Sequence, residues 1–82
     1  MPMSETPLAE RIARVLAGVA LSSNADGING SAGDDVDRTW KRHMNQALAV
    51  LHTMREADHL MAEAGDPLVW TRMVDAAIRD AE

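Results

Sequence analysis

The chain lacks cysteine, phenylalanine and tyrosine, and two tryptophans make up its whole aromatic content. Without cysteine there is no disulfide, no thiolate ligand for zinc or an iron–sulfur cluster, and no cysteine nucleophile. The scarcity of aromatic residues leaves core formation mainly to aliphatic side chains and methionine. Several classes of redox, metal and covalent chemistry are therefore excluded.

Long apolar runs and an excess of positive charge are also lacking. No run approaches the roughly 20 apolar residues that cross a bilayer, and the segment from Met1 to Glu5 does not resemble a signal peptide. The 13 acidic and 8 basic side chains give a net charge of −5, which opposes nonspecific binding to nucleic acid or anionic lipid. We expect a cytoplasmic protein that does not bind a membrane. Nucleic acid is a disfavoured partner.

Alanine supplies much of what is apolar. Hydrophobic residues make up 46% of the 82 residues, and 14 of them are alanine. A domain of this size buries only about 60% of the surface that its unfolded chain exposes, so its core is thin. We expect one helical domain over residues 1–82 that forms a homo-oligomer or binds another protein.

The first expected helix begins at Thr6 and Pro7, because a capping residue followed by proline is typical of a helix N-terminus. Apolar residues then recur at helical spacing on one face. This stripe consists of Leu8, Ile12, Val15, Leu16 and Val19. We expect a helix over residues 7–21, followed by a flexible loop over residues 22–35 that is rich in Ser, Asn, Gly and Asp.

A second helix is expected over residues 36–55, with Asp34 and Asp35 as its capping acids. One face is apolar at helical spacing. That face consists of Trp40, Met44, Ala47, Leu48, Leu51 and Met54.

The apolar pattern changes phase after Met54. The next apolar residues are Ala57, Leu60, Met61 and Ala64. They lie on an arc rotated by roughly 120° from the first, and one straight helix cannot bury both arcs against one neighbour. We expect a kink or short break between Arg55 and Asp58, and then a short helix or kinked continuation over residues 57–64. Gly65 is expected to end it in the left-handed conformation.

The last helix begins at Asp66 and Pro67, which repeat the capping acid and helix-first proline, and it is expected to span residues 67–81. Its apolar stripe consists of Trp70, Met73, Val74, Ala77, Ile78 and Ala81. No segment shows the alternation of a strand. The predicted fold class is all-α, a small three- or four-helix assembly with a long flexible loop after the first helix. The expected core residues are Leu16, Trp40, Leu51, Met61, Trp70 and Met73.

Three histidines, His43, His52 and His59, are candidate metal ligands. A helical metal pair needs a spacing of three or four, whereas these are nine and seven apart. His52 and His59 could share a face only if the helix ran straight through the change of phase. The Asp-rich and Gly-rich segment does not match the EF-hand pattern, and no local catalytic motif is present. We expect no metal, no cofactor and no enzymatic activity.

One local basic patch, formed by Arg38, Lys41 and Arg42, provides an alternative function, that of a small DNA-associated regulator. Three acids directly precede or interrupt the patch: Asp34, Asp35 and Asp37. They cancel much of its field within a Debye length. A solvated helix face therefore accounts for these bases better than a DNA-reading face.

A series of short motifs runs through most of the chain: Trp40, Ala47-Leu48, Met54-Arg55-Glu56, Met61, Ala64-Gly65, Val69-Trp70 and the segment from Met73 to Ala77. In this pattern the chain resembles a group of short proteins of alphaproteobacteria and their phages. In that group Pro-Thr follows the position of Glu56, whereas this chain has Ala57-Asp58, which leaves a kink or a continuous helix open. The resemblance implies a small bacterial or phage-related protein and points to no particular activity. From the thin, alanine-rich core and the lack of a catalytic motif we predict a non-enzymatic helical interaction protein that self-associates.

Overall fold

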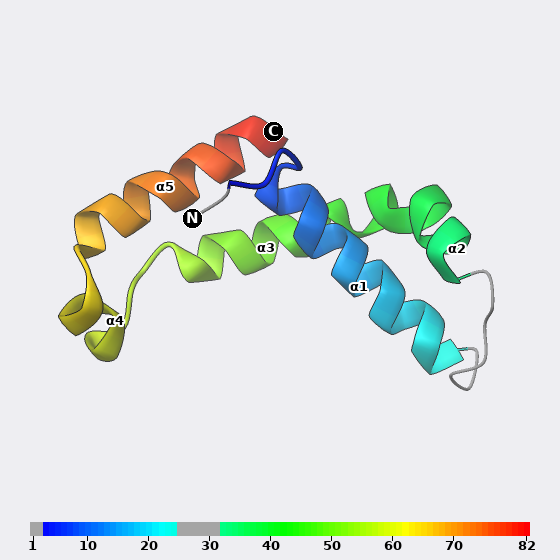
Figure 1. The fold of residues 1–82 in the computed structure, drawn as a ribbon, viewed down its shortest axis with the longest axis horizontal. Helices are drawn as coiled ribbons and strands as arrows, with labels where there is room; N and C mark the ends of the chain where they lie inside the picture. The colour runs from blue at the N-terminus through cyan, green and yellow to red at the C-terminus, as the bar shows by residue number, and fades with distance from the viewer. Residues whose placement is uncertain (1–2, 25–31) are drawn as a thin grey trace.

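The structure, a computed structural model, describes residues 3–24 and 32–82. The described residues are helical and contain no strand, which confirms the all-α fold class (Figure 1). In chain order the elements are α1 (Leu8–Asn24), α2 (Ala32–Thr39), the 3₁₀ segment η1 (Trp40–His43), α3 (Met44–Met54), α4 (His59–Ala64) and α5 (Pro67–Ala81).

Alanines form the contact between α1 and the middle of the chain. Ala9, Ala13 and Ala17 recur every fourth residue, so they share one face of α1, and none exposes more than 1% of its surface. Ala47 on α3 is equally buried, and α1 packs against η1, α3 and α2. Small side chains allow helices to approach closely but bury little apolar area. The fully buried face of α1 is therefore its alanine face. Of the predicted stripe, Leu8, Ile12 and Leu16 are half-buried, whereas Val15 and Val19 are exposed.

The larger buried side chains lie where α3 and α5 pack together. Leu51 from α3 meets Val74 and Ile78 from α5 in one cluster with Ala9, and all four are buried. Half-buried side chains surround this cluster: Leu8, Ile12, Met44, Leu48, Met54, Trp70, Ala77 and Ala81. Full burial of each Leu, Val or Ile contributes about 1.5 to 3 kcal/mol. This cluster is the principal hydrophobic core of the described residues.

The expected break after α3 is present, and side chains of α5 stabilise it. Trp70 Nε1 donates a 2.6 Å hydrogen bond to the carbonyl oxygen of Met54, and Thr71 Oγ1 donates a 2.7 Å bond to that of Arg55. Asp75 adds an ion pair, with Oδ1 2.6 Å from Arg55 Nε. The two hydrogen bonds satisfy carbonyl groups that the end of a helix leaves without intrahelical partners.

The predicted loop over residues 22–35 is wrong at both ends. Residues 22–24 continue α1, and residues 32–35 begin α2; the rest of that loop, residues 25–31, lies outside the described part of the chain. Packing overrides weak helix propensity here, because α2 lies against α1 and Val36 approaches Gly18. Asp34 and Asp35 consequently occupy the first turn of α2 rather than the capping position.

The predicted continuous helix over residues 36–55 is also wrong, because it is divided into α2, η1 and α3. Thr39, the last residue of α2, donates a 2.7 Å hydrogen bond from Oγ1 to the carbonyl oxygen of Asp35. Such a bond from a threonine to the residue four positions earlier bends helices. The chain then tightens into a 3₁₀ turn before α3 begins.

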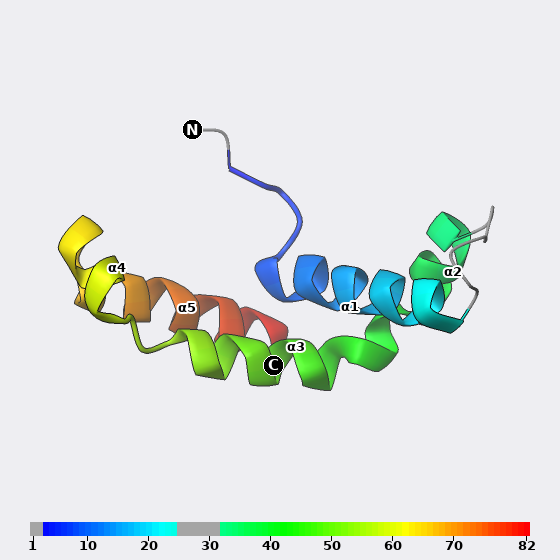
Figure 2. The same cartoon turned by 90° about the horizontal axis from the view of Figure 1, so that it is seen from below.

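The molecule is elongated. Its principal extents are 42 × 25 × 25 Å and its radius of gyration is 14.9 Å, whereas a compact domain of this length has a radius of gyration of about 12 Å. Figure 2 shows α4 at one end of the long axis, and α2 with the C-terminal part of α1 at the other. An elongated chain of this size has much of its surface in contact with water.

Candidate interaction surface

Two aspartate caps fix the position of α4 relative to α5. Asp58 Oδ1 accepts a 2.9 Å hydrogen bond from the backbone N–H of Met61, and Asp66 Oδ1 accepts one of 2.9 Å from that of Leu68. Gly65 between them is extended, with φ −166°, so the predicted left-handed stop is wrong. Asp66 needs an extended backbone to cap α5, and two extended residues join the helices directly.

An apolar groove lies where α4 and α5 meet. It has a volume of about 430 Å³ and is lined by residues of both helices and their connections. Its larger side chains are Met61 from α4, and Val69, Trp70 and Met73 from α5. The smaller ones are Ala57, Ala64 and Pro67. This lining is almost wholly apolar: its one titratable residue is Asp66, whose carboxylate caps α5.

Five large apolar side chains of α4 and the first half of α5 are exposed, and we call them the α4–α5 surface: Leu60, Met61, Leu68, Val69 and Met73. Three of them, Met61, Val69 and Met73, line the groove. Met73 has 64% of its surface exposed, Leu68 69% and Leu60 75%. Single exposed apolar residues are ordinary in soluble proteins, but a contiguous group of them marks an interaction site. The exposed apolar side chains of α4 and α5 are therefore treated as a candidate interaction surface.

The prediction that Met61 and Met73 belong to the core is wrong, because both are exposed. α5 turns Val74 and Ile78 toward α3, and Met73 lies about 100° around the helix from Val74. Of the other expected core residues, Leu51 is completely buried, whereas Leu16, Trp40 and Trp70 are half-buried. The apolar stripe read from the sequence of α5 contained Met73, but it could not show which part of the stripe α3 covers.

The segment beside the groove is acidic. Four acids and no lysine or arginine occur between residues 56 and 66: Glu56, Asp58, Glu63 and Asp66. All four are exposed. His59 is the one further titratable residue of this segment, with Nε2 3.9 Å from Glu63 Oε1. Of these acids Asp66 lines the groove, so a partner there meets an apolar lining in an acidic segment of the chain.

The residues of the basic patch are largely engaged with their neighbours. Arg38 forms an ion pair with Asp35, and Lys41 Nζ lies 5.8 Å from the centre of the Trp40 ring. Arg42 is exposed and has no ion pair within the described residues. Because Arg38 is paired with Asp35 and Lys41 lies over the Trp40 ring, the patch does not present three free cations to a phosphate backbone.

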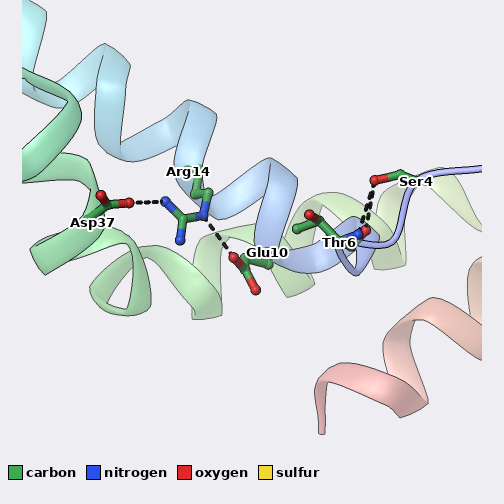
Figure 3. A network of polar contacts seen from close by, with 5 residues as sticks. All are labelled: Ser4, Thr6, Glu10, Arg14 and Asp37. Atoms are coloured by element: carbon green, nitrogen blue, oxygen red, sulfur yellow. Dashed lines mark hydrogen bonds and ion pairs between the residues drawn. The ribbon is translucent and has the colours of Figure 1, made fainter.

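Arg14 joins α1 to α2 (Figure 3). Its Nη1 lies 2.6 Å from Asp37 Oδ1 and its Nε 2.8 Å from Glu10 Oε2, while its guanidinium stacks 5.2 Å from the centre of the Trp40 ring. Hydrogen bonding to Asp37 and then to Glu10 raises the pKa of Arg14 above its ordinary value. This network has no open position for a ligand, and it accounts for the position of Trp40 outside the main core.

The histidines do not converge. His43 Nδ1 contacts Gln46 Oε1 at 3.0 Å, His52 lies beside a polar cleft at the end of α3, and His59 is on α4. Within residues 3–24 and 32–82, no group of three or more histidines and acids is arranged to hold a metal ion. The metal hypothesis required His52 and His59 to share a face, and the break after α3 separates their helices.

The comparisons with known proteins add no constraint. No family model matches the chain, and no curated protein or solved structure matches it significantly. None of the helices described is both long and apolar enough to cross a membrane.

Proposed function

We propose that this protein is a non-enzymatic, cytoplasmic helical interaction protein that self-associates through the α4–α5 surface. The observation that carries the proposal is the exposure of five large apolar side chains on α4 and α5, three of which line one groove. Methionine is well suited to such a surface, because its flexible, polarisable side chain adapts to a partner. Two of the five residues are methionines, Met61 and Met73.

The total exposed area supports a second chain as the partner. The protein exposes 6176 Å², whereas a monomeric protein of this mass exposes about 4,800 Å². The excess is larger than the roughly 800 Å² that each partner buries in an interface of standard size. Only seven hydrophobic residues among those described are buried, and four of these are alanine. A second copy would supply apolar contacts that the single chain does not make.

A comparison of glutamate substitutions tests the proposal. In Met73→Glu a charge stands within the α4–α5 surface, and its desolvation should prevent association. Ala62→Glu is the matched control, because Ala62 is exposed on α4 about 160° from Leu60 around the helix. Multi-angle light scattering should give a mass that rises with concentration for the wild type and for Ala62→Glu, and a monomer mass for Met73→Glu.

Two results contradict the proposal. One is a wild type that stays monomeric at every concentration. The other is Met73→Glu associating as strongly as the wild type does. Far-ultraviolet circular dichroism should give the same helicity for both variants, because each substitution replaces an exposed side chain.

No observation favours the DNA-associated alternative. It predicts steep, salt-dependent retention of the protein on DNA, weakened in the triple variant Arg38→Gln, Lys41→Gln, Arg42→Gln. We expect no retention even at low salt, because Arg38 is paired and the net charge is −5. Retention that the triple variant abolishes would establish the alternative.

A further inference from the structure

A second exposed apolar feature lies on α1. Val15 and Val19 have 65% and 60% of their surfaces exposed, and Arg11 is exposed one turn earlier. We call these three residues the α1 stripe. They recur every fourth residue and face about 160° away from the buried alanines of the same helix. Arg11 has no ion pair among the described residues, in contrast to Arg14.

The two apolar features lie in different parts of the molecule. α4 and its junction with α5 occupy one end of the long axis, and the C-terminal part of α1 lies toward the other end (Figure 2). A two-fold symmetric contact joins a patch to the same patch on the second copy. Such a contact through either feature leaves the other exposed. A head-to-tail contact between the two features covers both.

The two features match in shape. Val15 and Val19 form a ridge of residues spaced by four on α1, and Val69 and Met73 form a ridge of the same spacing on α5. Ridges of this kind interdigitate in the commonest class of helix packing, with an angle of about −50° between the axes. The groove of about 430 Å³ beside the α5 ridge provides space for valine side chains from a second helix.

The two features also match in charge. Asp66 lines the groove, and the segment of residues 56–66, which contains α4, also carries Glu56, Asp58 and Glu63 and no lysine or arginine. The α1 stripe carries Arg11 in line with its valines, so a docked α1 brings a positive charge to this acidic segment. A contact of the groove with a second groove would instead bring two acidic segments together. Charge therefore favours the head-to-tail arrangement.

From this match we infer that the protein assembles head to tail: the α1 stripe of one copy docks in the α4–α5 groove of the next. The inference rests on the proposed function and specifies its geometry. An open assembly of this kind has one free stripe at one end and one free groove at the other, and every interior copy has both features occupied. Growth stops only where the rotation between neighbours closes a ring.

Mixing two variants tests the arrangement. Val15→Glu has a defective stripe and an intact groove, whereas Met73→Glu has the reverse. Each variant alone should be monomeric by light scattering. An equimolar mixture should form a 1:1 heterodimer and nothing larger, because the intact groove of one variant accepts the intact stripe of the other and the remaining features are both defective. The wild type should form larger species at the same concentration.

The other outcomes distinguish the inference from the proposed function. If Val15→Glu self-associates like the wild type while Met73→Glu does not, the contact is groove to groove, and the inference fails while the proposed function stands. If Met73→Glu self-associates like the wild type, both fail. If the wild type associates and the mixture stays monomeric, the head-to-tail arrangement is wrong. If either glutamate variant loses helicity, Val19→Gln and Met73→Gln provide the same pair with milder changes.

Charge reversal gives an independent readout. Arg11→Glu should weaken self-association about twofold to fivefold at low salt, as expected for an exposed ion pair. Mixing Arg11→Glu with Glu63→Lys should recover the lost affinity, because the opposite charges meet again in reversed order. Unchanged affinity of self-association in Arg11→Glu would contradict the placement of Arg11 beside the acidic segment of residues 56–66 in the neighbouring copy.

Discussion

One helix, α5, takes part in two very different surfaces. On one side, Val74 and Ile78 pack against Leu51 of α3 and are buried. About 140° around the helix, Val69 and Met73 line a groove and are exposed. Both sides follow helical apolar spacing and have similar residue types. The two sides therefore differ in burial because α3 covers one side of α5 and no described element covers the other.

The largest loss of stability is expected from a substitution at the contact between α3 and α5. Leu51→Ala removes a completely buried side chain and should lower the free energy of unfolding by about 2 to 5 kcal/mol, because it leaves a cavity between α3 and α5. Chemical denaturation followed by circular dichroism measures the loss. Leu60→Ala is the control, since Leu60 is 75% exposed and its truncation should change the free energy by less than about 0.5 kcal/mol. Equal losses in the two variants would contradict the assignment of covered and uncovered sides.

A smaller effect is expected at the alanine contact of α1. Ala13 is completely buried, and Ala13→Leu should destabilise the protein by about 1 to 3 kcal/mol, because the larger side chain forces the helices apart. Ala49→Leu, at an exposed position of α3, should leave the midpoint of thermal unfolding nearly unchanged. If the Ala13 variant were the more stable one, close packing of alanines could not be what joins α1 to the rest of the fold.

The helix break after α3 should give a still smaller effect. Thr71→Val removes the hydroxyl that donates to the carbonyl oxygen of Arg55 and should cost about 0.5 to 1.5 kcal/mol of unfolding free energy. Thr53→Val is matched to it, because the Thr53 hydroxyl donates to Ala49 within its own helix and its loss leaves the contact between α3 and α5 intact. A Thr71→Val variant as stable as the wild type would show that this bond contributes nothing to holding α5 against the break.

The smallest effect on the stability of the monomer is expected on the exposed side of α5. Met73→Gln should change the free energy of unfolding by less than about 0.5 kcal/mol when measured at a dilution where the protein is monomeric. The same variant should weaken self-association at higher concentration. A substantial loss of monomer stability would instead place Met73 in the core, as the sequence pattern had indicated.

Much of the fold was predictable because local chemistry determines it. Asp66 and Pro67 begin α5 as their capping pattern predicts, and the change of apolar phase after Met54 marks a real break. Each depends on residues within one or two helical turns. The all-α fold class follows from the same periodicity.

The features of the structure that could not be predicted from the sequence depend on contacts between distant residues. Helix at residues 32–35 requires α1 as a packing partner, and the hydrogen bonds from Trp70 and Thr71 join positions 16 residues apart. The exposure of Met73 follows from which side of α5 faces α3, and that of Met61 from its position on α4, beyond the end of α3. For the candidate surface, the signal present in the sequence was an excess of methionine over aromatic residues, which identified neither the helices nor the groove.

A concentration series of amide nuclear magnetic resonance spectra tests the central claim most directly, because it reports which residues change environment when copies meet. The account predicts that, between dilute and concentrated protein, amide shifts change along α4, in the first half of α5 and beside Val15 and Val19 on α1, while those around Leu51 stay constant. Spectra that do not change with concentration, or that change only around Arg38, Lys41 and Arg42, would contradict it.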